Sequence, residues 1–348
     1  MAKAAQKSQG SLLLRLGISL AALGGIGWFL RGKLGEAFSL LKEGLQWEWL
    51  VLATVIYVIA LALISWRFQI VLRVQDVKIS FRQSFYLSFV GLFFTLFTPS
   101  SLGGDVARGY FASQYSGNKT GSLTGVLLDR LLGFFTIVLI ALAALGFYSH
   151  GINLPFVKQA VWGALGILIS GIVFFSVPGF TRVFRLFSFL IPSEKWRQKI
   201  SGLYSSIREY RNHPRVLLSS LGLSVIAQLI FLASVYFLSQ ALQTGVPAGP
   251  FFILVPLVGF ASMAPSLSGL GVREAGFIFF FKPFMKTEQA LALSILYDFI
   301  FYGCALAGGI AFAFRGGLKR HLIEDFESQE PALEKTMLES SFENQGGR

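Results

Sequence analysis

The stretch FTPSSLGGDVARG at residues 97–109 interrupts a chain that is otherwise apolar enough to cross a membrane. A related stretch, MAPSLSGLGVREAG, occupies residues 263–276. Both contain Pro-Ser, then glycines, then an arginine nine or eight residues after the proline, Arg108 or Arg273. Broken helices and ionisable groups at membrane depth are costly, so they usually mark a binding or transport pathway. The duplicated break therefore predicts an internal repeat with a site between its halves.

The composition is that of a polytopic membrane protein. Hydrophobic residues make up 54% of the 348 residues and charged residues only 14%, against about a quarter in soluble domains. The sequence has no Walker loop, dinucleotide fingerprint or Ser-His-Asp arrangement, and its single cysteine, Cys304, excludes an internal disulfide. We attribute the net charge of +12 to basic loops facing anionic lipid rather than to nucleic acid. We therefore expect no enzyme, no cofactor, no metal site and no nucleic-acid partner.

The apolar segments predict an all-α polytopic membrane protein with six transmembrane helices plus two re-entrant helical hairpins. The six segments long enough for a bilayer core of about 30 Å are residues 12–30, 49–71, 121–148, 159–177, 215–243 and 288–314. Two shorter pairs flank the breaks, 82–98 with 105–116 and 250–264 with 272–284. The second helix of each pair would cover only about 18 Å, too little to span, so each pair is predicted to be a hairpin. The first segment is interpreted as a retained anchor rather than a signal peptide.

The basic residues orient the chain. With the N-terminus inside, the cytoplasmic segments collect most of the arginine and lysine, from Arg67 in the first such loop to the eight bases between residues 182 and 215. If segment 82–98 crossed fully, that eight-base loop would lie outside, against the positive-inside rule. Three predicted spans separate the hairpins, so the first must enter from the cytoplasmic side and the second from the outer side. This predicts an inverted-topology repeat in the cell (inner or plasma) membrane, with both termini cytoplasmic.

The chain is expected to divide into a membrane domain and a tail. The membrane domain covers residues 1–316, with one repeat at about 49–148 and the other at about 215–314, and the acidic tail at 317–348 is predicted to be disordered. Residues 180–213 between the repeats carry an apolar stripe opposite basic residues. Either an amphipathic helix on the inner membrane surface or a helix capping the bundle explains this pattern. The stripe consists of Trp196, Ile200, Leu203, Ile207 and Tyr210.

Two hypotheses explain the arginines of the breaks. Each break starts a second half-helix whose free N–H groups favour an anion, and arginine can hold a phosphate through two parallel hydrogen bonds. A lipid phosphate would then bind near Arg108 or Arg273. Alternatively, Arg108 with Asp129 and Arg273 with Asp298 form structural ion pairs that fasten each hairpin to the next span. The two hypotheses are compatible, because one pair can both anchor and gate.

The formal charges of the breaks limit the phosphate hypothesis. Three bases face four acids, so the region is not a simple anion trap. It suits a zwitterionic or cationic headgroup, or an acid that exchanges protons, for which Glu274 and Asp298 are the candidates. The charged residues counted are Arg108, Arg130, Arg273, Asp105, Asp129, Glu274 and Asp298.

The two breaks, the Asp129-Arg130 pair and the GLGVRE run at 269–274 resemble the lysylphosphatidylglycerol synthase transmembrane family, often called flippase-like domains. The resemblance covers residues 10–316. The family includes the membrane half of the multiple peptide resistance factor, to which flipping of lysyl-phosphatidylglycerol is attributed. The resemblance implies substrate-binding roles for Pro99, Gly103, Gly104, Asp105, Arg108, Asp129, Arg130, Gly269, Gly271, Arg273 and Glu274. The repeated pattern adds Ser100, Pro265, Ser266 and Asp298 as candidates.

The function we expect is translocation of a phospholipid or lipid-linked headgroup between leaflets, without covalent catalysis. The soluble aminoacyl-transfer domain of the multiple peptide resistance factor is not expected, because only a short tail follows the last span. The alternative is a non-transporting membrane scaffold or accessory subunit for a separate lipid or glycan synthase. The expected partners are anionic or zwitterionic membrane lipids, and a synthase partner or a homo-oligomer is compatible with the sequence.

Overall fold

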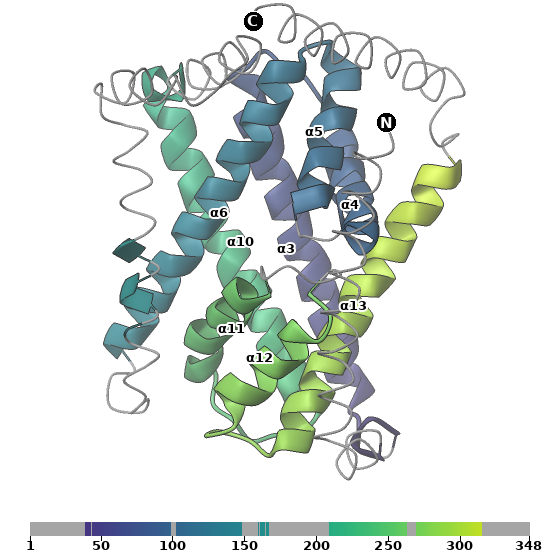
Figure 1. The fold of residues 1–348 in the computed structure, drawn as a ribbon, viewed down its shortest axis with the longest axis vertical. Helices are drawn as coiled ribbons and strands as arrows, with labels where there is room; N and C mark the ends of the chain where they lie inside the picture. Colours follow the sequence, from purple (N-terminus) through teal and green to yellow (C-terminus); the bar gives the residue numbers. More distant parts are fainter. Residues whose placement is uncertain are drawn as a thin grey trace, which may run out of the picture. The chain divides into compact units, whose positions relative to one another are not determined.

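The structure is a computed structural model, and it describes residues 39–42, 44–98, 102–147, 159, 161–163, 165–166, 209–262 and 269–314. The regular elements within these residues are all helices. They are α3 (Trp47–Arg73), α4 (Phe81–Phe97), α5 (Leu102–Ser116), α6 (Lys119–Phe147), the 3₁₀ helix η2 (Tyr210–Asn212), α10 (Pro214–Ala241), α11 (Gly249–Ala261), α12 (Val272–Phe281) and α13 (Thr287–Phe314) (Figure 1). The described helices belong to one compact unit as far as Gly308, which lies within α13.

Four of the described helices, α3, α6, α10 and α13, are long and apolar enough to cross a membrane. The shortest, α3, has 27 residues and is therefore about 40 Å long, more than the ~30 Å hydrocarbon core. Four of the six predicted spans are thus found as helices, and the chain is a multi-pass membrane protein. The other two predicted spans, 12–30 and 159–177, lie outside the described residues, apart from a few helical residues between 159 and 166.

The short helices α4 and α5 pack against each other as a hairpin. Ser80 begins α4 with a capping box, in which its hydroxyl accepts from the Gln83 N–H at 3.2 Å and the Gln83 side chain accepts from the Ser80 N–H at 2.7 Å. The two helices approach so closely that a Cβ on Gly104 would overlap the carbonyl oxygen of Gly91. Helix α5 begins at Leu102 rather than at 105, so the sequence prediction for its start was wrong by about one turn.

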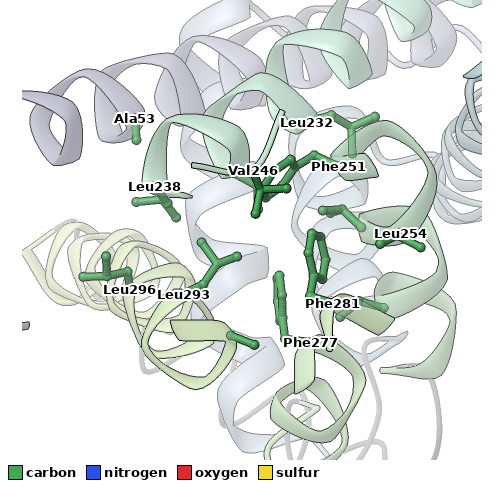
Figure 2. Packing of buried hydrophobic residues seen from close by; sticks show 14 of the residues in the cluster. Ala53, Leu232, Leu238, Val246, Phe251, Leu254, Phe277, Phe281, Leu293 and Leu296 are labelled. Carbon is green, nitrogen blue, oxygen red and sulfur yellow. The ribbon is translucent and has the colours of Figure 1, made fainter. Parts of the chain in front are cut away.

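Helices α11 and α12 form the second hairpin. Rings of Phe251 in α11 and Phe281 in α12 lie 5.0 Å apart between centroids, and Phe277 stacks on Phe281 at 5.8 Å. Figure 2 shows these rings facing Leu254 of α11 and Leu293 of α13 across the interior of this half of the protein. Lipid is as apolar as these side chains, so close packing rather than removal from water holds such a cluster together.

Helices α3 and α10 are antiparallel partners along their whole length. The Gln46 N–H, just before α3, donates to the Ala241 carbonyl at the end of α10 at 2.9 Å. At the other end, η2 precedes α10, and the Tyr210 hydroxyl donates to the Val71 carbonyl of α3 at 2.9 Å. Burial raises the pKa of the Tyr210 hydroxyl well above its usual value, so the group remains a donor. The remainder of the predicted stripe in 180–213, before Glu209, lies outside the described residues.

The two hairpins start from opposite ends of this α3–α10 pair (Figure 1). The first is joined to the C-terminal end of α3, where Gln69 donates to the Ile79 carbonyl and Asn118 donates to the Gln75 carbonyl, both at 2.9 Å. The second follows the C-terminal end of α10, which lies beside the N-terminal end of α3. The order span, hairpin, span therefore occurs twice, and the two hairpins project inward from opposite ends.

Candidate functional site

A chain of alternating positive and negative side chains joins the first hairpin to α3 and α6. Asp129 of α6 is buried between two arginines: Arg67 Nε lies 2.7 Å from its Oδ1, and Arg108 Nη1 lies 3.5 Å from its Oδ2. Arg108 Nη1 also lies 3.6 Å from Asp105 Oδ1, one helical turn earlier in α5. Asp105 in turn pairs with Arg130 of α6. The structure thus brings together Asp105, Arg108, Asp129 and Arg130, as the sequence predicts, and ties α5 to α6.

Arg67 is the member of this cluster that the sequence analysis misplaced. We counted it among the cytoplasmic bases, but it lies in α3, is only 5% exposed and forms the shortest contact to Asp129. Its Nη1 also donates to the Ser224 hydroxyl of α10 at 2.5 Å. The Ser224 hydroxyl accepts a second hydrogen bond, from the Thr136 hydroxyl of α6, at 2.9 Å. Arg67 therefore links three long helices. Its place within the predicted span 49–71 was the signal that could have identified it, because a charge at membrane depth needs a partner.

With Arg67 included, the positive and negative charges of this cluster no longer balance. Three arginines face two aspartates, so this cluster carries one excess positive charge: Arg67, Arg108, Arg130, Asp105 and Asp129. The earlier count, which gave more acids than bases around both breaks, was incomplete at this cluster. A group with one negative charge complements it.

Arg108 lies in a tightly shaped position. Its guanidinium lies 4.1 Å above the ring centroid of Phe68, and its stem passes directly over Gly91, where an added Cβ would come within 2.7 Å of the Arg108 Cγ. Only Nη1 has an ionic partner; Nε and Nη2 are buried without a hydrogen-bond partner. A buried donor without a partner is costly, so an unsatisfied edge calls for an explanation.

A cavity of about 280 Å³ lies beside this cluster, between the first hairpin and helices α3, α6, α10 and α13. Its polar wall contains Asp105, Arg108 and Arg130 together with the hydroxyls of Ser88 and Thr95. Apolar side chains form the remaining walls, among them Leu61, Ile64, Leu92 and Phe301. The cavity is therefore amphipathic, with its charged end at the α4–α5 hairpin.

The second hairpin holds its arginine differently. Arg273 Nη2 lies 2.5 Å from Asp298 Oδ1 and 3.3 Å from the Tyr302 hydroxyl. Its guanidinium lies 5.2 to 5.9 Å from the centroids of three rings of α13: Tyr297, Phe301 and Tyr302. The expected pair of Arg273 and Asp298 is thus present and enclosed by aromatic side chains.

Glu274 and the glycines of the second break shape the start of α12. Gly269 and Gly271 both have φ of +82°, a conformation that L side chains rarely adopt. The Glu274 carboxylate accepts from the Gly271 N–H at 2.6 Å and so satisfies an open donor of the helix start. With Arg273, Glu274 and Asp298, this cluster has one excess negative formal charge.

Aromatic side chains separate the two charged clusters. Phe301 both lines the cavity and lies 5.3 Å from the Arg273 guanidinium. Phe231 also lines the cavity, and its ring contacts Tyr57 at 6.0 Å and Tyr297 at 6.2 Å between centroids. The same aromatic side chains therefore lie between the two clusters, with the cavity on the side of the first hairpin. We call this set the aromatic partition; it consists of Tyr57, Phe231, Tyr297 and Phe301.

The glycines of the first break allow two helices to approach closely. Gly103 and Gly104 lie inside α5, where added Cβ atoms would overlap the side chains of Thr98 and Thr95 of the first hairpin. They permit close packing rather than a turn. Pro99, Ser100, Pro265 and Ser266 lie outside the described residues. Within the described part of the chain no group of three His, Cys, Asp or Glu residues could hold a metal, and Cys304 is buried.

Comparison with known proteins gives a single positive result. A family model described as the lysylphosphatidylglycerol synthase TM region matches residues 12–309, which is most of the chain. No curated protein and no solved structure is significantly similar to it.

Proposed function

The chain belongs to the lysylphosphatidylglycerol synthase transmembrane family, and from that premise we propose that it translocates a phospholipid or lipid-linked headgroup between the leaflets of the cell membrane. The family supports a role in membrane lipid metabolism. The translocation step is our inference from the site. It requires no covalent chemistry, and we propose that the chain is not an enzyme.

The observation that carries this proposal is the amphipathic cavity between the first hairpin and the long helices. Small-molecule pockets are typically about 300–1,000 Å³, so a cavity of about 280 Å³ suits a compact headgroup and not a whole lipid. The charged wall offers partners for the polar group, and the apolar walls suit the adjoining glycerol and the first carbons of acyl chains. A headgroup in this cavity would have charged partners on one side while it crosses.

The opposed hairpins support a route to both leaflets. They project from opposite ends of the α3–α10 pair, and hairpins or broken helices so placed are characteristic of inverted-topology repeats with a central site. We propose that residues 49–148 and 215–314 form such a repeat, that the hairpins are re-entrant, and that both termini are cytoplasmic. The aromatic partition between the two charged clusters would then be the part that rearranges.

A reconstituted assay tests the proposal. Full-length protein in proteoliposomes should expose a phospholipid that carries its fluorophore on an acyl chain from the inner leaflet to an external, impermeant quencher faster than protein-free vesicles do. The variant Arg108→Gln removes a base that lines the cavity; it should remain folded but lose translocation. Arg82→Gln removes an exposed arginine at the start of α4 and is the matched control, which should transport normally.

The same assay decides against a scaffold. A scaffold for a lipid or glycan synthase needs no headgroup pathway. The lipid fluorescence in vesicles with the purified chain alone would then be quenched no faster than in empty vesicles. Wild-type protein that is folded but inactive in vesicles of several lipid compositions would contradict the transport proposal. Retained transport in Arg108→Gln would place the substrate step away from this cavity.

A further inference from the structure

Arg108 is buried, yet it uses only part of its hydrogen-bonding capacity. The residue is 9% exposed, and of its guanidinium nitrogens Nη1 alone faces carboxylates, at 3.5 Å from Asp129 and 3.6 Å from Asp105. Nε and Nη2 are buried without hydrogen-bond partners and have almost no accessible surface, while Arg108 also lines the cavity, so a ligand in the cavity reaches these nitrogens only after the side chain turns toward it. These two nitrogens form one edge of the planar guanidinium, and their N–H groups are parallel. Such an edge matches two oxygens of one phosphate.

We propose that the cavity beside the α4–α5 hairpin is a binding site for a phosphate group, held by the Nε–Nη2 edge of Arg108. The inference rests on the proposed function and names the chemical group that the site recognises. Ser88 and Thr95 line the same cavity, but their hydroxyls already donate to the Ser84 carbonyl at 3.1 Å and the Gly91 carbonyl at 2.9 Å, so the binding of the phosphate rests on Arg108. The phosphate belongs either to a lipid headgroup or to free phosphate, and these two sources are separated below.

The charge of the cluster supports one anionic group and no more. Its three arginines and two aspartates leave one excess positive charge, which a phosphodiester with a single negative charge neutralises. Asp105, the acid that lines the cavity, is paired with Arg130 and also lies near Arg108. Its charge is therefore compensated within the cluster and does not exclude an anion from the cavity.

Arg273 is the weaker candidate for the phosphate. Its Nε is also buried without a hydrogen-bond partner, but its Nη2 is engaged by Asp298 and by the Tyr302 hydroxyl, and three aromatic rings surround its guanidinium. The acids near it outnumber it, since Glu274 lies in the same turn of α12. An anion entering there would meet an excess of negative charge. The structure thus assigns the phosphate to the first hairpin.

Binding to purified full-length protein in a maltoside detergent, which contains no phosphate, tests this assignment. The probes are dihexanoyl-phosphatidylglycerol, dihexanoylglycerol with the same chains but no phosphate, and inorganic phosphate. We expect phosphatidylglycerol to bind saturably and dihexanoylglycerol to bind much more weakly. Charge-assisted hydrogen bonds are the strong ones, so Arg108→Gln should raise the dissociation constant at least about ten-fold.

Two further variants make the result specific. Arg108→Lys keeps the charge but not the two parallel donors, so its affinity should lie between those of wild type and Arg108→Gln. Arg82→Gln removes an exposed positive charge outside the cavity and should change the dissociation constant less than two-fold. Equal affinity of wild type and Arg108→Gln for phosphatidylglycerol, or equal affinity of wild type for both dihexanoyl probes, would overturn the assignment.

Inorganic phosphate identifies the source of the group. Arg108-dependent competition by inorganic phosphate at concentrations similar to those of the lipid supports the site with free phosphate as a ligand. Arg108-dependent binding of the lipid alone supports the site with a headgroup as ligand. The proposed function fails separately: a wild-type protein that binds the lipid through Arg108 but does not translocate it retains the site and loses the transport role.

Discussion

Replacing Arg108 or Arg273 by glutamine should affect the stability of the protein very differently. Asp298 has Arg273, at 2.5 Å, as its only ion-pair partner among the described residues. Asp129 has two partners, and the closer of them, Arg67 at 2.7 Å, remains when Arg108 is replaced. The two arginines occupy corresponding places in the two breaks, so the comparison holds the chemistry of the substitution constant.

The expected magnitudes follow from these contacts. Arg273→Gln leaves a buried carboxylate without a counter-ion, which costs about 3–5 kcal/mol of unfolding free energy. Arg108→Gln loses only two long ionic contacts, at 3.5 and 3.6 Å, and the cation–π contact with Phe68, while it also removes two unsatisfied buried donors. We expect a net loss of about 1–2 kcal/mol.

Reversible unfolding in mixed micelles, followed by far-UV circular dichroism or steric trapping, measures both values. Adding Asp298→Asn to Arg273→Gln should restore most of the lost stability, since no unpaired charge then remains. Adding Asp129→Asn to Arg108→Gln should lower stability further, because it leaves the buried Arg67 without its counter-ion. The reasoning is refuted if Arg108→Gln destabilises as much as Arg273→Gln, or if the Arg108 and Asp129 double variant recovers.

Two further outcomes are expected. Gly104→Ala places a methyl group against the backbone of α4 and should cost about 1–3 kcal/mol, whereas Gly222→Ala, with nothing within 4 Å of the added carbon, should be neutral or stabilising by up to about 1 kcal/mol; thermal unfolding of both variants compares them. In a Cys304→Ala background, an impermeant maleimide should label Lys286→Cys from outside intact cells and Lys78→Cys only after permeabilisation. Labelling of both from one side would contradict the opposed hairpins.

The long helices and the hairpins were predictable because their signals are local. The length of each apolar run shows whether the segment can span the membrane. The segment after each break is too short to do so, which predicts a hairpin. The pairing of Arg273 with Asp298 was also predictable, because two charges in adjacent apolar segments have few other partners. Four predicted spans and both predicted hairpins accordingly appear as helices in the described residues.

The details of the first site were not predictable, because they depend on how helices distant in sequence approach one another. The position of Arg67 within the predicted span 49–71 could have indicated that it is buried, but its pairing with Asp129 depends on how α3 and α6 pack. Gly103 and Gly104 lie in α5, and the close approach of α4 leaves no room for a Cβ at either position, which the sequence alone does not show. The glycines of the second break do lie in a turn, with φ of +82° at Gly269 and Gly271.

This difference between the two hairpins has a consequence for how the site would work. In the second hairpin the glycines shape the backbone, and Arg273 is held by one acid and a set of rings, so its position is fixed mainly by the protein itself. In the first hairpin the glycines allow α4 and α5 to approach, and Asp129 is shared, which leaves the outer edge of Arg108 unsatisfied beside a cavity. A ligand that completes this edge gains hydrogen bonds that the empty protein lacks. Ligand binding should therefore change the first hairpin more than the second, because a ligand shifts conformations only through interactions that differ between them.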